Sequence, residues 1–427
     1  MGPPSDSRRS SAAPGGGPAS APSVPEFFGA YIDDYFGSIA RLSWADLVRD
    51  QEGLYASLAF GTAGIAYTHW YAGYLRGDEI LLAEAERWIR AALAGQRHRF
   101  AFLTPRAQPG DRMPPGAYLY GRAGLSFVHA LIARSRDERR AERRALACFA
   151  ELSRAAAAGT AELYTGSAGC LAATAILFQH LGGGKLLDLG TELSATLRQR
   201  ALLGGQGNVT WNGVHGLGLA HGAAGVHLAL LLWSAAAGSD LPYWFAPSLA
   251  AILDTALQFP ERFTRREQDR CSLCNGIIGP AFLALRAAQV LQEPSFLAAA
   301  RAITALATAR LPDCSDLCCG RAGCAFALLP LARQDPGGPW RKLAQDLALS
   351  TLLCDRADWS LAGLFGGEAA IPCLALNMTL GIDSGPPCLD FIASFPIGAR
   401  ISDRHSAASS LPSCDRTARS SFMAPRS

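Results

Sequence analysis

Apolar residues along this chain fall into two kinds of segment that alternate. Segments such as 170–181 and 226–238 are mostly apolar over ten or more consecutive positions. They are too long for ordinary strands and rich in Ala and Leu, so they predict buried helices. Segments such as 78–95 and 294–311 carry a polar stripe at helical spacing. That pattern predicts amphipathic helices with one buried face.

A short glycine motif precedes each of the buried segments. It has the form Gly-x-x-Gly, except that its seventh copy ends in Ala370, and the copies follow one another at intervals of 60, 45, 56, 54, 44 and 47 residues. Recurrence at such spacing indicates an array of similar units rather than several unrelated domains. The motifs begin at Gly61, Gly121, Gly166, Gly222, Gly276, Gly320 and Gly367.

One buried and one amphipathic helix per repeat predict two concentric layers of helices, and seven such pairs can close into a ring. Glycines at the start of a helix allow positive φ and let neighbouring turns pack without Cβ atoms between them. If all the turns lie on one rim, the residues beside the glycines converge on a single cavity. Glycine pairs serving helix packing alone would be the simpler explanation, but polar and metal-capable residues stand beside several of them.

Three cysteines stand directly before two of these turns, namely Cys274, Cys318 and Cys319. Thiolates are ligands that Zn²⁺ favours, and three protein ligands leave a fourth position for water or substrate. The two halves lie 44 residues apart, so they can meet only through the fold. Cys271 forms a local Cys-x-x-Cys with Cys274, and a structural zinc site is therefore the first competing interpretation.

At these motifs the sequence resembles the lanthionine synthetase C family, which comprises the cyclases of lanthipeptides and their LanC-like relatives. The resemblance spans roughly residues 30–390. It rests on GLAHGAAGVHLALLL at 218–232, RCSLCNGIIGPAFLAL at 270–285, LCCGRAGCAFALL at 317–329 and SLAGLFGGEAAIPCLAL at 360–376. It implies an all-α fold, an α/α toroid of seven inner and seven outer helices, with one catalytic zinc at the centre.

The resemblance also implies roles for individual residues. The Cys of the family's Trp-Cys-x-Gly motif falls on Cys274, and the Cys-His-Gly motif falls on Cys318 and Cys319, so that a third cysteine replaces the usual histidine ligand. An added thiolate makes zinc a weaker Lewis acid but leaves a bound substrate thiolate more nucleophilic. We therefore expect a Zn²⁺ site that is active.

Three further residues match the family's catalytic positions. His221 matches the histidine that exchanges protons with the substrate, and Arg270 matches the arginine that stabilises enolate charge. Glu162 matches an acid that the family often carries four residues before the third glycine turn, and we expect it to orient His221, although a Glu at a helix start is commonly only a capping or dipole contact. Leu273 and Asn275 depart from the Trp and the His or Tyr that flank the first zinc cysteine in the family, which affects substrate fit more than metal binding.

The expected reaction is a zinc-assisted addition of cysteine thiols to dehydroalanine or dehydrobutyrine in a dehydrated precursor peptide, which forms thioether rings. The chain lacks the dehydratase or kinase domain of fused synthetases, so a separate dehydratase is an expected partner. Three alternatives stay open: a LanC-like enzyme that adds glutathione to dehydroamino acids, a non-catalytic peptide-binding scaffold, and an α/α-toroid carbohydrate enzyme. The last would require two convergent carboxylates, and few acids accompany these turns.

Composition narrows the remaining possibilities. A net charge of +3 does not provide the concentrated basic face of a nucleic-acid binder, and polar residues interrupt every apolar stretch before it could span a membrane. Without an apolar signal segment, we expect a cytoplasmic protein with reduced thiols. Cys324 should then pack as a small hydrophobe, and Cys271 and Cys314 are secondary candidates as thiols near the metal.

The domain boundaries follow from where the pattern begins and fades. Residues 1–24 are rich in Pro, Gly, Ser and Ala, and residues 391–427 form a polar tail. Neither segment can bury enough apolar surface to fold, so both are expected to be disordered. Residues 25–390 are expected to form a single LanC-like toroid domain.

Overall fold

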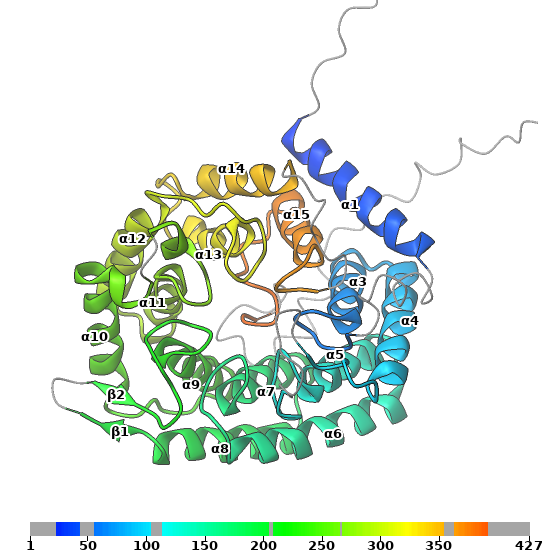
Figure 1. The fold of residues 1–427 in the computed structure, drawn as a ribbon, viewed down its shortest axis with the longest axis horizontal. Helices are drawn as coiled ribbons and strands as arrows, with labels where there is room; N and C mark the ends of the chain where they lie inside the picture. Colours follow the sequence, from blue (N-terminus) through cyan, green and yellow to red (C-terminus); the bar gives the residue numbers. More distant parts are fainter. Residues whose placement is uncertain are drawn as a thin grey trace, which may run out of the picture.

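The helices form two concentric rings around a common axis, an α/α toroid (Figure 1). Inner and outer helices alternate along the chain, and an inner helix packs against the outer helix that follows it. The predicted all-α toroid is confirmed, with seven inner and seven outer helices in the part of the chain that is described. The computed structural model describes residues 23–42, 55–103, 113–204, 208–264, 267–353 and 363–391.

The inner helices are buried along most of their length. In α9 (Ala223–Ala237), every residue from Ala223 to Ser234 is buried, and none of them is Asp, Glu, Lys or Arg. A helix without a polar face is stable only when protein surrounds it, which explains the need for a second layer. The other inner helices are α3 (Thr62–Arg76), α5 (Arg122–Ser135), α7 (Ser167–Leu181), α11 (Ile278–Leu291), α13 (Arg321–Gln334) and α15 (Ala370–Leu380).

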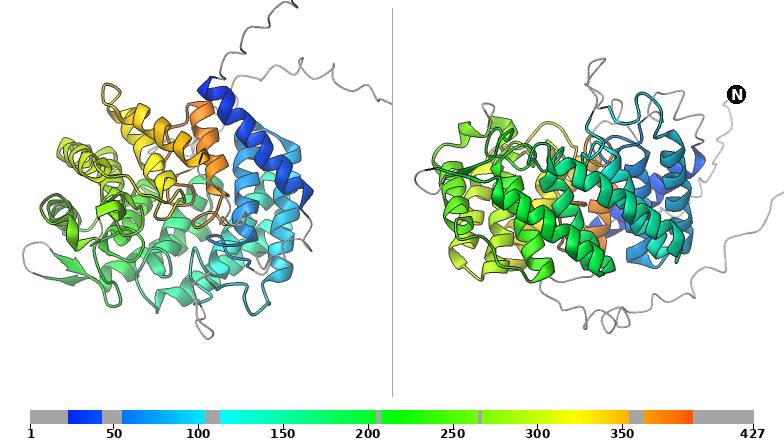
Figure 2. Two further views of the ribbon diagram at one scale, coloured as in Figure 1. Left: turned by 45° about the horizontal axis from the view of Figure 1, so that its top comes forward. Right: turned by 90° about the horizontal axis from the view of Figure 1, so that it is seen from below.

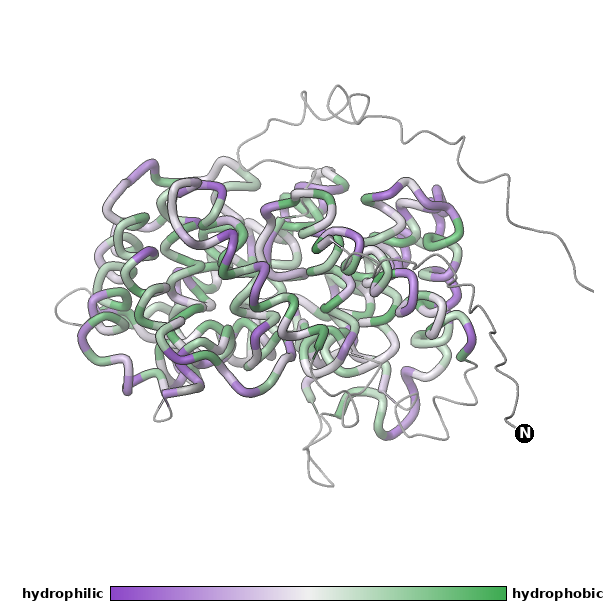
Figure 3. Tube along the Cα trace, turned by 90° about the horizontal axis from the view of Figure 1, so that it is seen from above, coloured by the Kyte–Doolittle hydropathy of each residue, from purple (hydrophilic) through white to green (hydrophobic). Residues whose placement is uncertain are grey.

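The outer helices bury only one stripe. In α4 (Glu79–Gly95), the buried residues recur at helical spacing from Leu82 to Ala92, and the Asp78 side chain caps the first turn by accepting hydrogen bonds from two backbone N–H groups. Seen edge-on, hydrophilic and hydrophobic positions alternate along the helices (Figure 3). The remaining outer helices are α1 (Val24–Arg41), α6 (Arg139–Ala157), α8 (Gly184–Gln199), α10 (Phe245–Gln258), α12 (Pro294–Thr308) and α14 (Trp340–Leu352).

The two ends of the domain close the ring together. Helix α15 contacts α3, which completes the inner layer, and α1 lies along α15 as its outer partner (Figures 1 and 2). The Tyr31 hydroxyl of α1 donates a hydrogen bond to Glu368 at 2.9 Å, and the Tyr71 hydroxyl of α3 donates one to Asn377 of α15 at 2.8 Å. The first helix is thus part of the toroid rather than an appendage.

The segment that follows α15 turns into the middle of the ring (Figure 1). Its Asp390 forms a buried ion pair with Arg286 of α11, and the Tyr118 hydroxyl donates a hydrogen bond to the carbonyl oxygen of Cys388 at 2.9 Å. Contacts of this segment therefore reach opposite sides of the inner layer. Removing one partner of the ion pair would leave a buried charge uncompensated, which is strongly destabilising.

The other described elements are small: the antiparallel strands β1 (Leu202–Leu203) and β2 (Val209–Thr210), and the 3₁₀ helices η3 (Pro260–Arg262) and η4 (Glu267–Cys271). Among the residues described, no helix combines the length and the apolar character that crossing a bilayer requires. The expected disordered ends, residues 1–24 and 391–427, lie almost entirely outside the described residues, of which Ser23 is the first and Phe391 the last.

Candidate metal centre

The turns before the inner helices are joined to one another by a closed ring of backbone hydrogen bonds. In each turn, the residue two positions before the first glycine donates its backbone N–H to the backbone carbonyl oxygen of the equivalent residue in the next turn. Cys274 donates in this way to Cys318 at 3.1 Å, and Cys318 donates to Phe365 at 3.1 Å. Phe365 closes the ring by donating to Ala59 at 3.0 Å. We call these residues the ring positions: Ala59, Leu119, Tyr164, Ala220, Cys274, Cys318 and Phe365.

The next residue of each turn behaves differently. Six of the seven ring positions are buried and Cys318 is half-buried, whereas every residue directly before the first glycine is half-buried or exposed. The ring thus fixes one set of side chains in the protein and presents the next set to solvent. We call the second set the rim positions: Phe60, Tyr120, Thr165, His221, Asn275, Cys319 and Gly366.

The glycines are required by close packing. A Cβ atom at Gly323, the second glycine of the sixth turn, would lie 2.1 Å from the Leu317 carbonyl oxygen and 3.2 Å from Leu273 Cβ of the neighbouring turn. The positive φ that glycine allows is not used at Gly222 and Gly320, which have φ of −120° and −107°. They begin the inner helices as extended N-cap residues, and the absence of a side chain is what lets adjacent turns touch.

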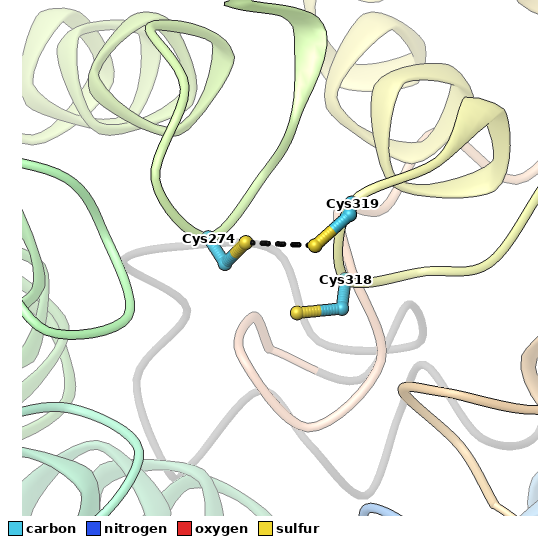
Figure 4. A group of neighbouring side chains, drawn as sticks. All are labelled: Cys274, Cys318 and Cys319. Atoms are coloured by element: carbon cyan, nitrogen blue, oxygen red, sulfur yellow. Dashed lines mark hydrogen bonds between the residues drawn. The ribbon is translucent and has the colours of Figure 1, made fainter. Parts of the chain in front are cut away.

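Cys274, Cys318 and Cys319 converge from the fifth and sixth turns (Figure 4). Their sulfur atoms all lie within 4.8 Å of one another, and the Cys274 and Cys319 sulfurs are 3.2 Å apart. Tetrahedral Zn²⁺ with Zn–S bonds of about 2.3 Å would hold its sulfur ligands about 3.8 Å apart. The cluster is therefore compatible in size with three thiolate ligands around one ion.

The closeness of the three thiols changes their pKa values. Hydrogen bonds from Cys318 and Cys319 hold the pKa of Cys274 well below its usual value, so the first proton leaves easily. The interaction with Cys274 then raises the pKa of Cys319 to about 12, and it raises the pKa of Cys318 as well. Three thiolates this close would repel one another, and a divalent metal bound among them would favour loss of the remaining protons.

His221 and Glu162 form a pair at the same end of the ring. His221 Nδ1 lies 3.0 Å from Glu162 Oε2, and the Thr165 hydroxyl donates to the same oxygen. Burial raises the pKa of Glu162, but the hydrogen bonds from His221 and Thr165 outweigh it, so the net pKa lies below the usual 4.5. Because the carboxylate is charged, it favours a proton on Nδ1 and leaves Nε2 of a neutral ring free to accept one.

Aromatic side chains connect this pair to the thiols. The Tyr164 ring stands edge-on to the His221 ring with centroids 5.6 Å apart, and the Tyr164 hydroxyl lies 4.0 Å from the Cys318 sulfur. Tyr120 meets Tyr164 edge-on at 5.9 Å and stacks on Phe60 at 5.5 Å. One continuous aromatic wall therefore extends from the first turn to the candidate proton-transfer residue.

Comparisons with known proteins agree with the toroid fold. A family model described as "Lanthionine synthetase C-like protein" matches residues 54–352. The chain belongs to the lanthionine synthetase C-like family. Among solved structures, it is similar to a protein named nisin cyclase, with a TM-score of 0.59 and 14% sequence identity over 84% of this chain and 94% of that one. No curated protein matches the chain in sequence.

Arg270, the third residue that the LanC-like resemblance singled out, lies in η4 just ahead of Cys274. Its guanidinium is 3.9 Å from Glu267, whose other oxygen pairs with Arg310, while the buried Arg270 Nε has no hydrogen-bond partner among the described residues. The structure thus brings Arg270 to the loop that carries Cys274 but records no contact with His221. Its role in stabilising enolate charge stays a prediction.

Asp316 is a functional candidate that sequence reasoning missed. Its carboxylate accepts a hydrogen bond from the backbone N–H of Cys319 at 2.6 Å, which fixes the turn that carries two of the thiols. Burial raises the pKa of Asp316 to about 6. The signal was present in the sequence, since Asp316 stands four residues before Gly320, as Glu162 does before Gly166.

Two expectations about the other cysteines were wrong. Cys271 and Cys324 are paired in a disulfide with a Cα–Cα distance of 6.0 Å, so Cys271 is not a spare thiol near the metal, and Cys324 is not merely a small hydrophobe. The expectation that all thiols are reduced fails with them. The bond joins η4 to α13, the two elements next to the three-thiol cluster, and both cysteines are fully buried.

Proposed function

We propose that this chain is a zinc-dependent lanthipeptide cyclase, which adds cysteine thiols of a dehydrated peptide to dehydroalanine or dehydrobutyrine residues. Membership of the LanC-like family supports the reaction class. The observation that carries the proposal is the convergence of three thiols that Tyr164 connects to the pair formed by His221 and Glu162. Zinc, the substrate and the residue roles are parts of the proposal.

Cys274, Cys318 and Cys319 are the residues that would hold the ion, and they leave one coordination position for a substrate thiol. A bound zinc ion supplies positive charge that lowers the pKa of such a thiol and favours the thiolate at neutral pH. Asp316 holds the backbone of Cys319, and the Tyr164 hydroxyl faces the Cys318 sulfur. These contacts restrict the movement of the ligands around the ion.

His221 is the proposed proton-transfer residue. With Nδ1–H donated to the Glu162 carboxylate, Nε2 is oriented to take the proton of the substrate thiol and to return it later. The side chain of His221 is 40% exposed and that of Glu162 is 14% exposed, so the ring can reach a peptide while its partner stays fixed. Glu162 is thus a positioning residue, and His221 is the residue proposed to touch the reacting atoms.

The overall reaction is the addition of S–H across a carbon–carbon double bond. The sulfur forms a bond to the β-carbon, the π electrons move toward the α-carbon and its carbonyl, and a proton then completes the α-carbon. Nothing is oxidised or reduced, and no nucleotide is consumed. Because the substrate must already contain dehydroamino acids, we also propose that a separate dehydratase supplies it.

The test is incubation of the purified chain with a dehydrated peptide that contains one free cysteine, with and without glutathione. Ring formation leaves the mass unchanged and protects the cysteine from alkylation, whereas a glutathione adduct adds the mass of the tripeptide. We expect protection without an adduct. An adduct with no ring would replace the cyclase proposal with the scavenger alternative.

Metal content provides the matched control. We expect about one zinc per chain in the wild-type protein, and a loss of both metal and ring formation in Cys318→Ala. Cys148→Ala removes a half-buried cysteine of α6, outside the cluster, and should keep both. A wild-type protein that holds no zinc would leave only the non-catalytic scaffold, while equal zinc in both variants would contradict the assigned ligands.

A further inference from the structure

Phe60 and Tyr120 form a partly exposed aromatic platform on the rim. Their rings are parallel to within 5° and their centroids are 5.5 Å apart. They occupy equivalent rim positions in the first two turns, as His221 and Cys319 do in the fourth and sixth. The platform therefore belongs to the same set of solvent-facing residues as the candidate catalytic groups.

The surrounding turns hold the platform in place. The backbone N–H of Phe60 donates to the Ser57 hydroxyl at 3.2 Å, which fixes the turn. Gly366 leaves room for the ring, since a Cβ atom there would lie 2.2 Å from Phe60 Cε1. On the other side, Tyr120 meets the edge of Tyr164. An aromatic pair held this way, yet left partly exposed, has some surface to offer a ligand.

Phe60 and Tyr120 pack against the hydrophobic core but keep part of their surface exposed. Phe127 and Phe149, by contrast, are fully buried. When another apolar group covers a large apolar ring that is in contact with water, the free energy of the system decreases. Tyr120 contacts the buried Tyr164 ring, and Tyr164 contacts His221, so this exposed surface lies two ring contacts from the candidate proton-transfer residue.

We propose that Phe60 and Tyr120 are a specificity subsite that receives an aromatic or large aliphatic side chain next to the reacting residue of the peptide. This inference rests on the proposed function, because it assumes a peptide held at the thiols. The stacked faces suit a flat or bulky apolar group, and the neighbouring wall leads from the platform to the Cys318 sulfur through Tyr164.

The experiment measures binding of two short peptides to the zinc-loaded full chain. Both contain one cysteine and no dehydroamino acid, so neither can react, and they differ only in a Phe or a Ser beside the cysteine. We expect the Phe peptide to bind about tenfold more tightly, which corresponds to about 1.4 kcal/mol. Phe60→Ala and Tyr120→Ala should reduce this preference to about twofold or less.

Two further variants separate a binding role from a folding defect. Gly366→Ala keeps both aromatic residues but places a methyl group against the Phe60 ring, and it should also reduce the preference. Tyr243→Ala removes an aromatic side chain that is 83% exposed in the connection between α9 and α10, and it should keep the full preference. Helical circular dichroism and zinc content verify that each variant is folded.

Equal wild-type affinity for the two peptides would overturn the subsite, and so would a preference that survives in both Phe60→Ala and Tyr120→Ala. A third peptide with Lys beside the cysteine should bind no better than the Ser peptide, and tighter binding of Lys than of Phe would also overturn it. If the preference is present but dehydrated peptides form no ring, the subsite stands and the cyclase proposal fails. If rings form without any preference, the cyclase proposal stands and the subsite fails.

Discussion

The substitution Gly279→Ala tests whether the glycine turns set the geometry of the metal centre. A Cβ atom at Gly279 would lie 2.5 Å from the Leu273 carbonyl oxygen and 2.8 Å from Leu219 Cβ. Because ordinary contacts begin at 3.4 Å, the carbonyl must move by roughly 0.9 Å in a close-packed interior. The Leu273 carbonyl and the Cys274 N–H belong to the same peptide unit, and this N–H donates a hydrogen bond to the Cys318 carbonyl. A shift of the Leu273 carbonyl therefore moves the backbone that carries the Cys274 thiol.

Overpacking of this kind costs about 1–3 kcal/mol. With an unfolding entropy of about 2.1 cal/mol/K per residue, a domain of this length loses about 1–4 °C in melting temperature. Displacement of Cys274 should in addition weaken zinc binding by about 10–100-fold, the scale seen when the support of a metal ligand is disturbed. Thermal unfolding of the apo protein and competition with a chromophoric chelator measure the two effects separately.

Two control substitutions distinguish the effects. Gly124→Ala would place a Cβ atom 2.0 Å from the Tyr118 carbonyl oxygen in a turn without thiols, so it should lower the melting temperature but leave zinc affinity close to that of the wild type. Gly29→Ala lies in α1 with nothing within 4 Å and should stabilise the protein by about 0.5–1 kcal/mol. Wild-type stability and zinc affinity in Gly279→Ala would refute the reasoning.

Three other predictions follow from the same contacts. Glu162→Gln replaces a charge-assisted hydrogen bond to His221 that is worth about 1.5–3 kcal/mol. It should slow single-turnover ring formation at least about tenfold while the zinc content stays constant. An unchanged rate would contradict the pairing of Glu162 with His221. Burial lowers the pKa of His227 to about 4, so the unfolded chain binds more protons than the folded one between about pH 4 and 6.5, and stability decreases as the pH is lowered through that window. His227→Phe should reduce the loss between pH 7 and pH 5 by about 2 kcal/mol in denaturant titrations, and an equal loss would argue against a buried neutral imidazole. Peptide mapping without reductant should recover Cys271 linked to Cys324, and free thiols at both would exclude the bond.

The amino-acid sequence by itself determined the helices and their layers. Apolar runs such as 170–181 and striped segments such as 78–95 predict α7 and α4, because burial on all sides and burial on one side leave different periodic patterns. Each glycine turn also marked the residues beside it, including His221 and the three cysteines. These features are local, since a helix and its turn depend on residues only a few positions apart.

Only the tertiary structure decided which side chains meet. The contact between Glu162 and His221 joins residues 59 positions apart, and the stacking of Phe60 on Tyr120 joins two different repeats. The closed hydrogen-bond ring creates these contacts by placing equivalent residues of successive turns side by side. The hydrophobic pattern of the sequence indicates which face of a helix is buried, but it does not indicate which residues that face contacts. The partner depends on how all seven repeats close around the axis.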